Sequence, residues 1–438
     1  PMMTAQILNL LYNIVDRIYI GKIPGEGTIA LAGLGLCFPV ITLVTAFANL
    51  FGGGGAPLCS IARGRRDREG AERIMANACF MLLLTGVLLT VLGIALHKPV
   101  LYLLGASDAT YPYAASYLVI YLLGTVCVMT SLGLNPYINC QGFARMGMLT
   151  VLVGAVANIV LDPIFIFALG MGVSGAAVAT VLSQLLSALW VLRFLTGPKA
   201  ELRLHFRAFR PDFGCIRRIA VLGTSSFVMS FTDSMVQMAC NATLRTFGGD
   251  IYISVMTVIN SVRQIAQTPV MAISDGASPA ISFNYGAHAY GRVRAAIRFM
   301  TQLGFGYTLL IWALVSAFPA AFIMIFNHDA ELVATAVPAL HIYFFGFVMM
   351  AFQFSGQCVF KSLNRAGLAI FFSLLRKAFI VVPLTLLLPH IGGLGVNGVF
   401  LAEPVSNCVG GLACYLTMRR TVMPALRSRG QAGAQGIS

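Results

Sequence analysis

The sequence predicts an all-α integral membrane protein with twelve transmembrane helices, arranged as two parallel six-helix repeats. Of the 438 residues, 58% are hydrophobic and only 10% are charged, whereas a soluble globular chain carries about 25% charged residues. Apolar runs of roughly 20 residues, the length that a helix needs to cross a bilayer, recur along the whole chain. Runs this long and continuous favour helices over the shorter, alternating strands of a membrane barrel.

Charged residues, glycine and proline separate the apolar runs into the expected spans. The first six spans cover residues 1–22, 28–62, 74–97, 111–138, 143–169 and 172–196. The second six cover residues 214–244, 250–285, 294–320, 332–360, 366–389 and 393–418. We therefore expect an N-terminal six-helix lobe (1–197), a cytoplasmic linker (198–213), a C-terminal six-helix lobe (214–420) and a cytoplasmic tail (421–438). Because the chain begins at Pro1 inside an apolar run, we also expect a shortened or processed N-terminus.

The formal charge of +14 is distributed unevenly along the chain. Most of the 29 Lys and Arg residues fall near the connections after even-numbered spans or in the tail. The main clusters are Arg63–Arg73, Arg193–Arg218, Arg292–Arg298, Lys361–Lys377 and Arg419–Arg429. Cytoplasmic loops carry such an excess, so both termini are predicted to be cytoplasmic. The positive charge thus indicates how the chain is oriented in the membrane, and no nucleic-acid partner is needed to explain it.

Two pairs of segments indicate an internal duplication. "APLCSIARG" (Ala56–Gly64) matches "SPAISFNYG" (Ser278–Gly286) 222 positions later, and "QGFARMG" (Gln141–Gly147) matches "KSLNRAG" (Lys361–Gly367) 220 positions later. Nearly equal offsets that keep their order are hard to obtain by chance. An offset of six helices preserves membrane orientation, so the halves are expected to be parallel repeats around a central cavity, an architecture typical of transporters.

Polar residues follow one face of the first span. Gln6, Asn9, Asn13 and Asp16 are spaced 3, 4 and 3 residues apart, which places them in a continuous line on a helix. The rest of this segment is mostly apolar. The polar line is therefore expected to face protein or water instead of lipid.

The other first-half spans carry shorter polar sets. Asn158 and Asp162 lie one turn apart in the fifth span, Asn135 and Asn139 do so in the fourth, and Thr180 lies in the sixth. One interpretation is that these groups only hydrogen-bond helix to helix. The alternative is that they converge on a single pocket.

The carboxylates Asp16 and Asp162 favour the second interpretation. A charge at the bilayer centre costs about 3 kcal/mol on insertion scales, and amides would join helices at a much lower cost. A carboxyl group among apolar side chains can bind and release a proton, or hold Na⁺ together with nearby amide oxygens. We therefore predict a site for a coupling cation at Asp16 and Asp162.

The second half has polar residues of its own. Asp233 and Gln237 lie on one face of the seventh span, Arg263 and Asp275 lie in the eighth, and Glu403 precedes Pro404 in the last. These residues are candidates for lining a substrate cavity. Alternatively, Arg263 pairs with one of the acids, which would make that acid structural.

Other motifs point to no further chemistry. The glycine run Gly52–Gly55 lacks the Gly-Lys-Ser/Thr sequence of a phosphate-binding loop, so close helix packing is the better interpretation. The ten cysteines form no C-x-x-C pair and indicate neither a disulfide scaffold nor a zinc site. The histidines show no metal-binding spacing. We expect no cofactor, no metal centre and no enzymatic activity.

Three stretches of this chain resemble the multidrug and toxic compound extrusion (MATE) family, in particular its MepA-like bacterial branch. They are "LLYNIVDRIYIG" (Leu10–Gly21), "NIVLDPIFIFALGMGVSGAAVATVLSQ" (Asn158–Gln184) and "SPAISFNYGA" (Ser278–Ala287). The resemblance covers essentially the whole chain. It implies a V-shaped pair of six-helix bundles that exports organic cations in exchange for H⁺ or Na⁺.

The resemblance also assigns residues to the coupling site. It implies that Asp16, Asn158 and Asp162 take part, together with Thr180; the fourth-span member is Asn135 or Asn139. The acids of the second half vary across the family, so the resemblance assigns them no role.

Two other functions are alternatives to an antiporter. A lipid-linked precursor flippase of the same superfamily would need cavity arginines for a pyrophosphate, and the candidates are Arg17, Arg245 and Arg263. A membrane-embedded enzyme would need a metal-ligand set or a nucleophile–base pair, and none is evident. We expect a monomeric, multi-pass protein of a bacterial plasma (inner) membrane whose partners are the lipid bilayer and small organic cations or drugs.

Overall fold

The computed structural model describes residues 2–21, 23, 27–104, 106–205, 211–248, 250–326 and 330–435, and this part of the chain contains helices and no strands. The side chains of Asn13, Arg17 and Arg245 lie outside the described part. The chain divides into two compact units, Pro1–Phe227 and Val228–Ser438. The lobe and linker boundaries expected from the sequence remain a prediction.

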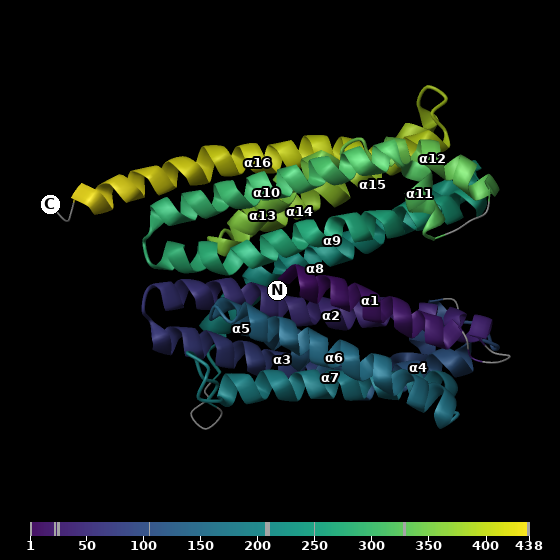
Figure 1. Ribbon diagram of the computed structural model, residues 1–438, viewed down its shortest axis with the longest axis horizontal. Coiled ribbons are helices and arrows are strands. Elements are labelled where there is room, and N and C mark those ends of the chain that lie inside the picture. Colours follow the sequence, from purple (N-terminus) through teal and green to yellow (C-terminus); the bar gives the residue numbers. More distant parts are fainter. Residues whose placement is uncertain are drawn as a thin grey trace. The chain divides into compact units, whose positions relative to one another are not determined.

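The first unit is a bundle of long helices joined by short connections (Figure 1). Its elements are α1 (Met2–Gly21), α2 (Gly27–Gly64), α3 (Arg68–Leu103), α4 (Tyr111–Leu123), α5 (Thr125–Cys140), α6 (Ala144–Pro163), the π-helix η1 (Ile164–Ala168), α7 (Gly172–Thr196) and the first part of α8 (Phe213–Gly248). Helix α6 packs against α1 and α7, and α2 packs against α3 and α5. This packing brings the polar faces of α1, α5, α6 and α7 into one bundle.

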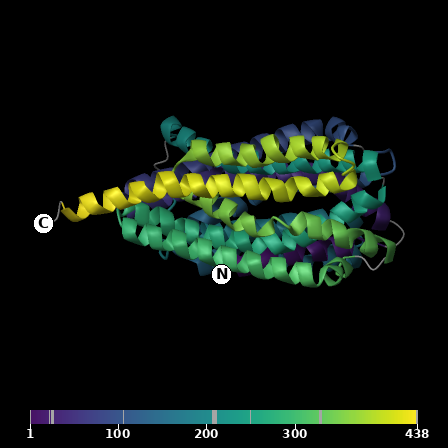
Figure 2. The same ribbon diagram turned by 90° about the horizontal axis from the view of Figure 1, so that it is seen from above.

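The second unit contains the rest of α8 and the helices that follow it. These are α9 (Asp250–Gly286), α10 (Tyr290–Ala317), α11 (Pro319–Met324), α12 (Ala330–Phe344), the 3₁₀-helix η2 (Phe347–Met349), α13 (Met350–Ser362), α14 (Ala366–Leu374), the π-helix η3 (Leu375–Val381), α15 (Val382–Leu387), the 3₁₀-helix η4 (Leu388–His390) and α16 (Val396–Gln435). Helix α16 packs against α13 and η3, and its C-terminal end extends beyond the other helices of the unit (Figures 1 and 2).

The helices match the predicted spans in position. In the described residues, eight helices are long and apolar enough to cross a membrane, or ten if each of two bent pairs is one span. The bent pairs are α4–α5, with an angle of 57°, and α12–α13, with an angle of 42°. Helices α1 and α9 lie outside this set and correspond to the other two predicted spans; both carry polar stripes. The all-helical membrane fold is thus confirmed.

The order of elements repeats between the two units. Each unit has a long helix that ends in a glycine (α2 and α9), then a bent pair (α4–α5 and α12–α13). Each then has a helix that passes into a π-helix (α6–η1 and α14–η3). The two weak sequence matches therefore mark equivalent elements.

The glycine run in α2 serves helix packing, as expected. A Cβ atom at Gly52 would lie 2.6 Å from the carbonyl oxygen of Gly133 on α5, and one at Gly54 would lie 2.6 Å from the backbone nitrogen of Gly223 on α8. Larger side chains would force these helices apart. The run therefore lets α2 approach two neighbours within the first unit.

Candidate functional site

The carboxylate in the middle of α6 is fully enclosed. Asp162 has no exposed surface, and Asn158, one turn earlier, is 2% exposed. Asn158 Nδ2 donates a hydrogen bond to Asp162 Oδ1 over 3.2 Å. The spacing of four residues therefore holds the amide against the carboxylate, as the sequence predicted.

Asp16 of α1 brings a second carboxyl group to the same point. The Asp16 side chain is within hydrogen-bonding contact of Asp162, since α1 packs directly on α6. Apart from this contact, the second oxygen of Asp162 has no hydrogen-bond partner among the described residues. Two carboxylates in contact repel each other when both are charged, and either a cation beside them or a shared proton relieves this repulsion.

A tyrosine on α4 completes the cluster. The hydroxyl groups of Tyr117 and Thr180 form a hydrogen bond, and Tyr117 lies close enough to Asp16 to interact with its charge. Thr180 Oγ1 donates to the carbonyl of Ala176 over 2.9 Å. Tyr117 was not predicted from the sequence, because "YPYAASYLVIYLL" has the pattern of an ordinary apolar span with several tyrosines.

A polar pocket of the first unit adjoins these residues. Asn158 and Thr180 lie in its wall together with Asn9, Asn135 and Gln184, and it is a hollow of about 60 Å³. Ser131 Oγ donates to Gln184 Oε1 over 2.6 Å in the same wall. Hydroxyl and amide groups on helices α1, α5, α6 and α7 thus line one hollow, while Asp16 and Asp162 are not part of its lining.

The two asparagines of α5 occupy different places. Asn135 lines the pocket, whereas Asn139 lies outside its lining and against Gly147 of α6. The amide oxygens of Asn135, Asn139 and Asn158 accept no hydrogen bond from any described residue. Such buried acceptors call for a donor or a cation, and of the two α5 residues Asn135 is the one positioned to contribute to the pocket.

The helix changes its winding immediately after the Asp162 carboxylate. Pro163 has no N–H to continue the hydrogen-bond ladder, and the next residues form the π-helix η1. The amide of Leu169 donates to the carbonyl of Ile164 over 2.9 Å, a spacing of five residues. A wider turn of this kind is less regular than an α-helix and is frequent at functional sites.

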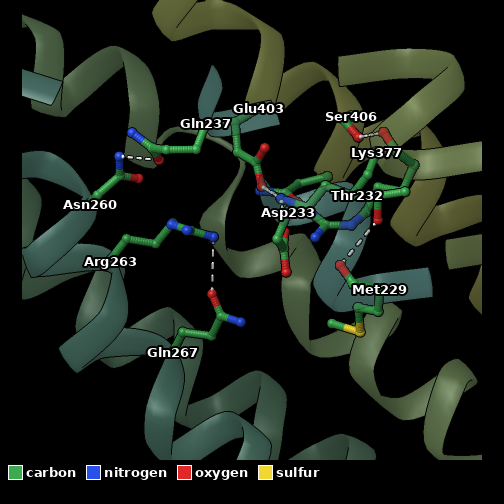
Figure 3. A network of polar contacts seen from close by, with 12 residues as sticks. Met229, Thr232, Asp233, Gln237, Asn260, Arg263, Gln267, Lys377, Glu403 and Ser406 are labelled. Carbon is green, nitrogen blue, oxygen red and sulfur yellow. Dashed lines mark hydrogen bonds and ion pairs between the residues drawn. The ribbon is translucent and has the colours of Figure 1, made fainter. Parts of the chain in front are cut away.

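In the second unit, the charged side chains form a network (Figure 3). Lys377 Nζ lies 3.0 Å from Asp233 Oδ1 and 3.0 Å from Glu403 Oε1. Arg376 Nη1 lies 3.0 Å from the same Glu403 oxygen and donates to Asn407 Oδ1 over 2.6 Å. The π-helix η3 carries these two consecutive cations inside the bundle, toward α8 and α16.

This network corrects the predicted location of two basic residues. Arg376 and Lys377 were counted with the cytoplasmic cluster Lys361–Lys377, but they are only 3% and 2% exposed and lie within a membrane helix. The prediction assigned basic residues to cytoplasmic loops from their position in the sequence alone. Acids on other helices, the buried Glu403 and the partly exposed Asp233, explain why these two cations are inside.

The remaining second-half candidates have separate environments. Arg263 Nη1 donates to Gln267 Oε1 over 3.3 Å, and Gln237 accepts from Asn260 over 2.9 Å. The predicted pairing of Arg263 with an acid is not found among the described residues, where Lys377 and Arg376 take that role. Asp275 is an exposed residue and lies apart from this network, nearest in charge to Lys361.

Comparison with known proteins places this geometry in a family. The model of the MatE family matches residues 1–164 and 226–387. The protein named multidrug export protein MepA of Staphylococcus saprophyticus is 22% identical over 424 residues, which cover 96% of this chain and 92% of that protein. The MepA protein of Staphylococcus haemolyticus is 26% identical over 285 residues, covering 65% of this chain and 62% of that protein.

Solved structures agree on the fold. A MATE protein in the bent conformation superposes with a TM-score of 0.92 at 24% identity, covering 98% of this chain and 95% of that one. The outward-facing conformation of a multidrug resistance MATE family transporter superposes with a TM-score of 0.91 at 24% identity, with the same coverage. Since the family model spans most of the sequence and the helical fold agrees almost end to end, this chain belongs to the MatE family and is a multi-pass membrane transporter, not an enzyme.

Proposed function

We propose that this protein is a secondary antiporter that exports amphipathic, often cationic organic compounds in exchange for H⁺ or Na⁺. The observation that carries the proposal is the contact between Asp16 and Asp162 beside a polar pocket. A carboxyl pair can exchange a proton or Na⁺, and no ATP-binding domain is recognisable in the sequence. The names of the relatives, which describe multidrug export, support the same substrate class.

The proposed coupling site consists of Asp16, Asp162, Asn158, Thr180 and Tyr117. Asn158 and Tyr117 would orient the two carboxyl groups, and the amide oxygens nearby suit Na⁺ as well as a protonated partner. Drug release would couple to cation entry because the two conformations of the transporter bind the cation with different affinities. Asn135 is a further candidate ligand, while Asn139 is a weaker one.

Purified protein in lipid vesicles tests the proposal directly. With ethidium as the transported cation, an imposed pH gradient or Na⁺ gradient should drive its movement, and an ionophore that collapses the active gradient should stop it. The gradient that drives transport identifies the coupling ion. Movement driven by ATP with both gradients collapsed would contradict the antiporter.

A lipid-linked pyrophosphate is a poorer substrate for this chain. Such a ligand needs several free cationic groups in one cavity, but Lys377 and Arg376 are already bonded to Glu403. Arg263 is the one of the three candidate arginines whose side chain is described, and it lines a pocket of the second unit.

We further propose that the protein acts as a single chain in a bacterial plasma membrane, with both termini and residues 198–213 in the cytoplasm. In a cysteine-free background, an impermeant maleimide applied to intact cells should label Asp108→Cys and leave Lys199→Cys unlabelled. Both positions are exposed, and Lys199 belongs to the basic cluster expected inside. After lysis both variants should react equally; labelling of Lys199→Cys alone in intact cells would reverse the topology.

A further inference from the structure

Arginines gather where α10 begins and where α16 leaves the second unit. Val293 and Ile297 of α10 belong to one hydrophobic cluster with Met418 and Val422 of α16, so the two helices lie side by side at this end (Figures 1 and 2). Both helices carry exposed arginines there, and we call them the arginine cluster. Its members are Arg292, Arg298, Arg419, Arg420 and Arg427.

On α16 the arginines continue a stripe of apolar side chains. Val409, Leu412 and Leu416 are 55%, 43% and 39% exposed and follow one another at three and four residues. Arg420 and Arg427 come four and then seven residues further on, which keeps them on the same side of the helix. Exposed apolar side chains on a membrane helix face the lipid. The two arginines therefore stand at the end of a lipid-facing stripe.

Helix α10 has the same arrangement. Phe299, Leu303 and Leu310 are 67%, 47% and 57% exposed, and Arg292 precedes Phe299 by seven residues. Spacings of seven, four and seven residues again keep these side chains on one side of the helix. Two neighbouring helices thus each present an apolar stripe that leads to an arginine at the same end of the unit.

The lengths of the helices place these arginines at the level of the lipid headgroups. From Val396 to Arg420, α16 rises about 36 Å, and from Arg292 to Ala317, α10 rises about 38 Å. The hydrocarbon core of a bilayer is about 30 Å thick, so an arginine lies just beyond the core on each helix. Arg427 lies about 10 Å further along α16, and its side chain leans back toward the N-terminus of the helix, which here is toward the bilayer.

The arginine cluster has no acidic counterpart nearby. After Asp275 the sequence contains three more acidic residues, Asp329, Glu331 and Glu403. Glu331 lies in the first turn of α12, which follows the opposite end of α10, and Glu403 belongs to the buried network. No ion pair between described residues involves the arginine cluster. Its positive charge is therefore available to an anion from outside the chain.

The first unit compensates its basic residues differently. Arg63 pairs with Glu201, and Arg68 pairs with Glu72 over 3.1 Å. These carboxylates reduce the local positive charge, and an added anion would compete with them. An anionic group at the membrane surface therefore gains more attraction at the second unit than at the first.

We propose that the arginine cluster and the two apolar stripes form a binding site for an anionic phospholipid. Its phosphate binds Arg292, Arg420 and Arg427, and its acyl chains lie along the stripes of α10 and α16. Basic clusters beside membrane helices recognise anionic headgroups, and a guanidinium can form two parallel hydrogen bonds with a phosphate. The site is independent of the exported compound and of the coupling ion.

Two phospholipids with the same acyl chains test this site. Phosphatidylglycerol has a net negative charge, whereas phosphatidylcholine is neutral overall. Binding of each lipid to the purified full chain in detergent is measured by native mass spectrometry. Arg420→Gln combined with Arg427→Gln should weaken binding of phosphatidylglycerol by about tenfold, because two arginines near an anionic headgroup are lost, and binding of phosphatidylcholine by less than about twofold.

Two matched variants separate the site from positive charge in general. Arg65→Gln combined with Arg68→Gln removes two exposed arginines of the first unit and should change the affinity for phosphatidylglycerol by less than about twofold. Arg420→Lys combined with Arg427→Lys keeps both charges and should retain most of the binding. Equal weakening of both lipids by the two glutamines on α16, or an equal loss in the first-unit variant, would overturn the proposal.

Glycerol phosphate supplies the charge of the headgroup without acyl chains. At the concentration of the lipid it should leave phosphatidylglycerol bound, because the apolar stripes hold the acyl chains. Displacement of the lipid would show a site for free phosphates and would contradict a lipid site. Since no transport is measured, these results are separate from the proposed function, and a protein that binds the lipid but exports no cation would contradict only the antiporter.

Discussion

Replacing Glu403 with Gln is expected to lower the free energy of unfolding by about 3 to 5 kcal/mol, because it leaves buried cations without their partner. The side chains of Arg376 and Glu403 are only 4% and 5% exposed, and Glu403 Oε1 bonds both Arg376 and Lys377. Lys377 keeps its ion pair with Asp233 in this variant. Most of the lost stability therefore comes from Arg376, whose buried charge no longer has a carboxylate partner. Denaturation of the purified protein in detergent, followed by circular dichroism, measures the effect.

An exposed ion pair of the first unit provides the matched control. Glu201 binds Arg63, and their side chains are 50% and 21% exposed, so Glu201→Gln should change stability by no more than about 1 kcal/mol. Adding Arg376→Gln to Glu403→Gln should recover part of the stability, since the uncompensated buried charge is gone. A loss as small as that of Glu201→Gln would mean that the network contributes little to holding the unit together.

The helical fold was predictable because the bilayer restricts what a long apolar run can form. The polar stripe of α1 and the Asn158–Asp162 pair were predictable for a related reason. A charged or amide side chain in such a run must face protein, and helical spacing then shows which residues share a face. Periodicity therefore located most residues of the proposed first-unit site.

The features that the sequence did not predict depend on contacts between helices that are far apart in the sequence. Tyr117 looks like any tyrosine in an apolar span, and only the packing of α4 against α7 brings its hydroxyl to Thr180. Arg376 and Lys377 look like a cytoplasmic pair, and their acids lie on α8 and α16. The sequence did contain a signal for their burial. Two consecutive basic residues stand in the middle of an apolar run, and acids without an assigned partner stand in other runs.

Neutralising either carboxylate of the first-unit pair is expected to stop gradient-driven export. Asp16→Asn and Asp162→Asn keep the size of each side chain and remove the group that takes up the coupling cation. Each should lower the initial rate of ethidium transport in vesicles by at least about tenfold, the equivalent of one lost charge-assisted interaction. Asp108→Asn, at an exposed loop position, should transport normally.

The double variant distinguishes a shared cation from two separate roles. The two carboxyl groups are in contact, and the Asp162 carboxylate accepts a hydrogen bond from Asn158 at the point where α6 passes into a π-helix. If one cation bridges both groups, losing the second group costs nothing further, because residues that act as a unit show non-additive effects. Asp16→Asn combined with Asp162→Asn should therefore transport about as slowly as either single variant. Rates that multiply in the double variant would instead assign the two aspartates to different steps, for example one to the cation and the other to the winding of α6.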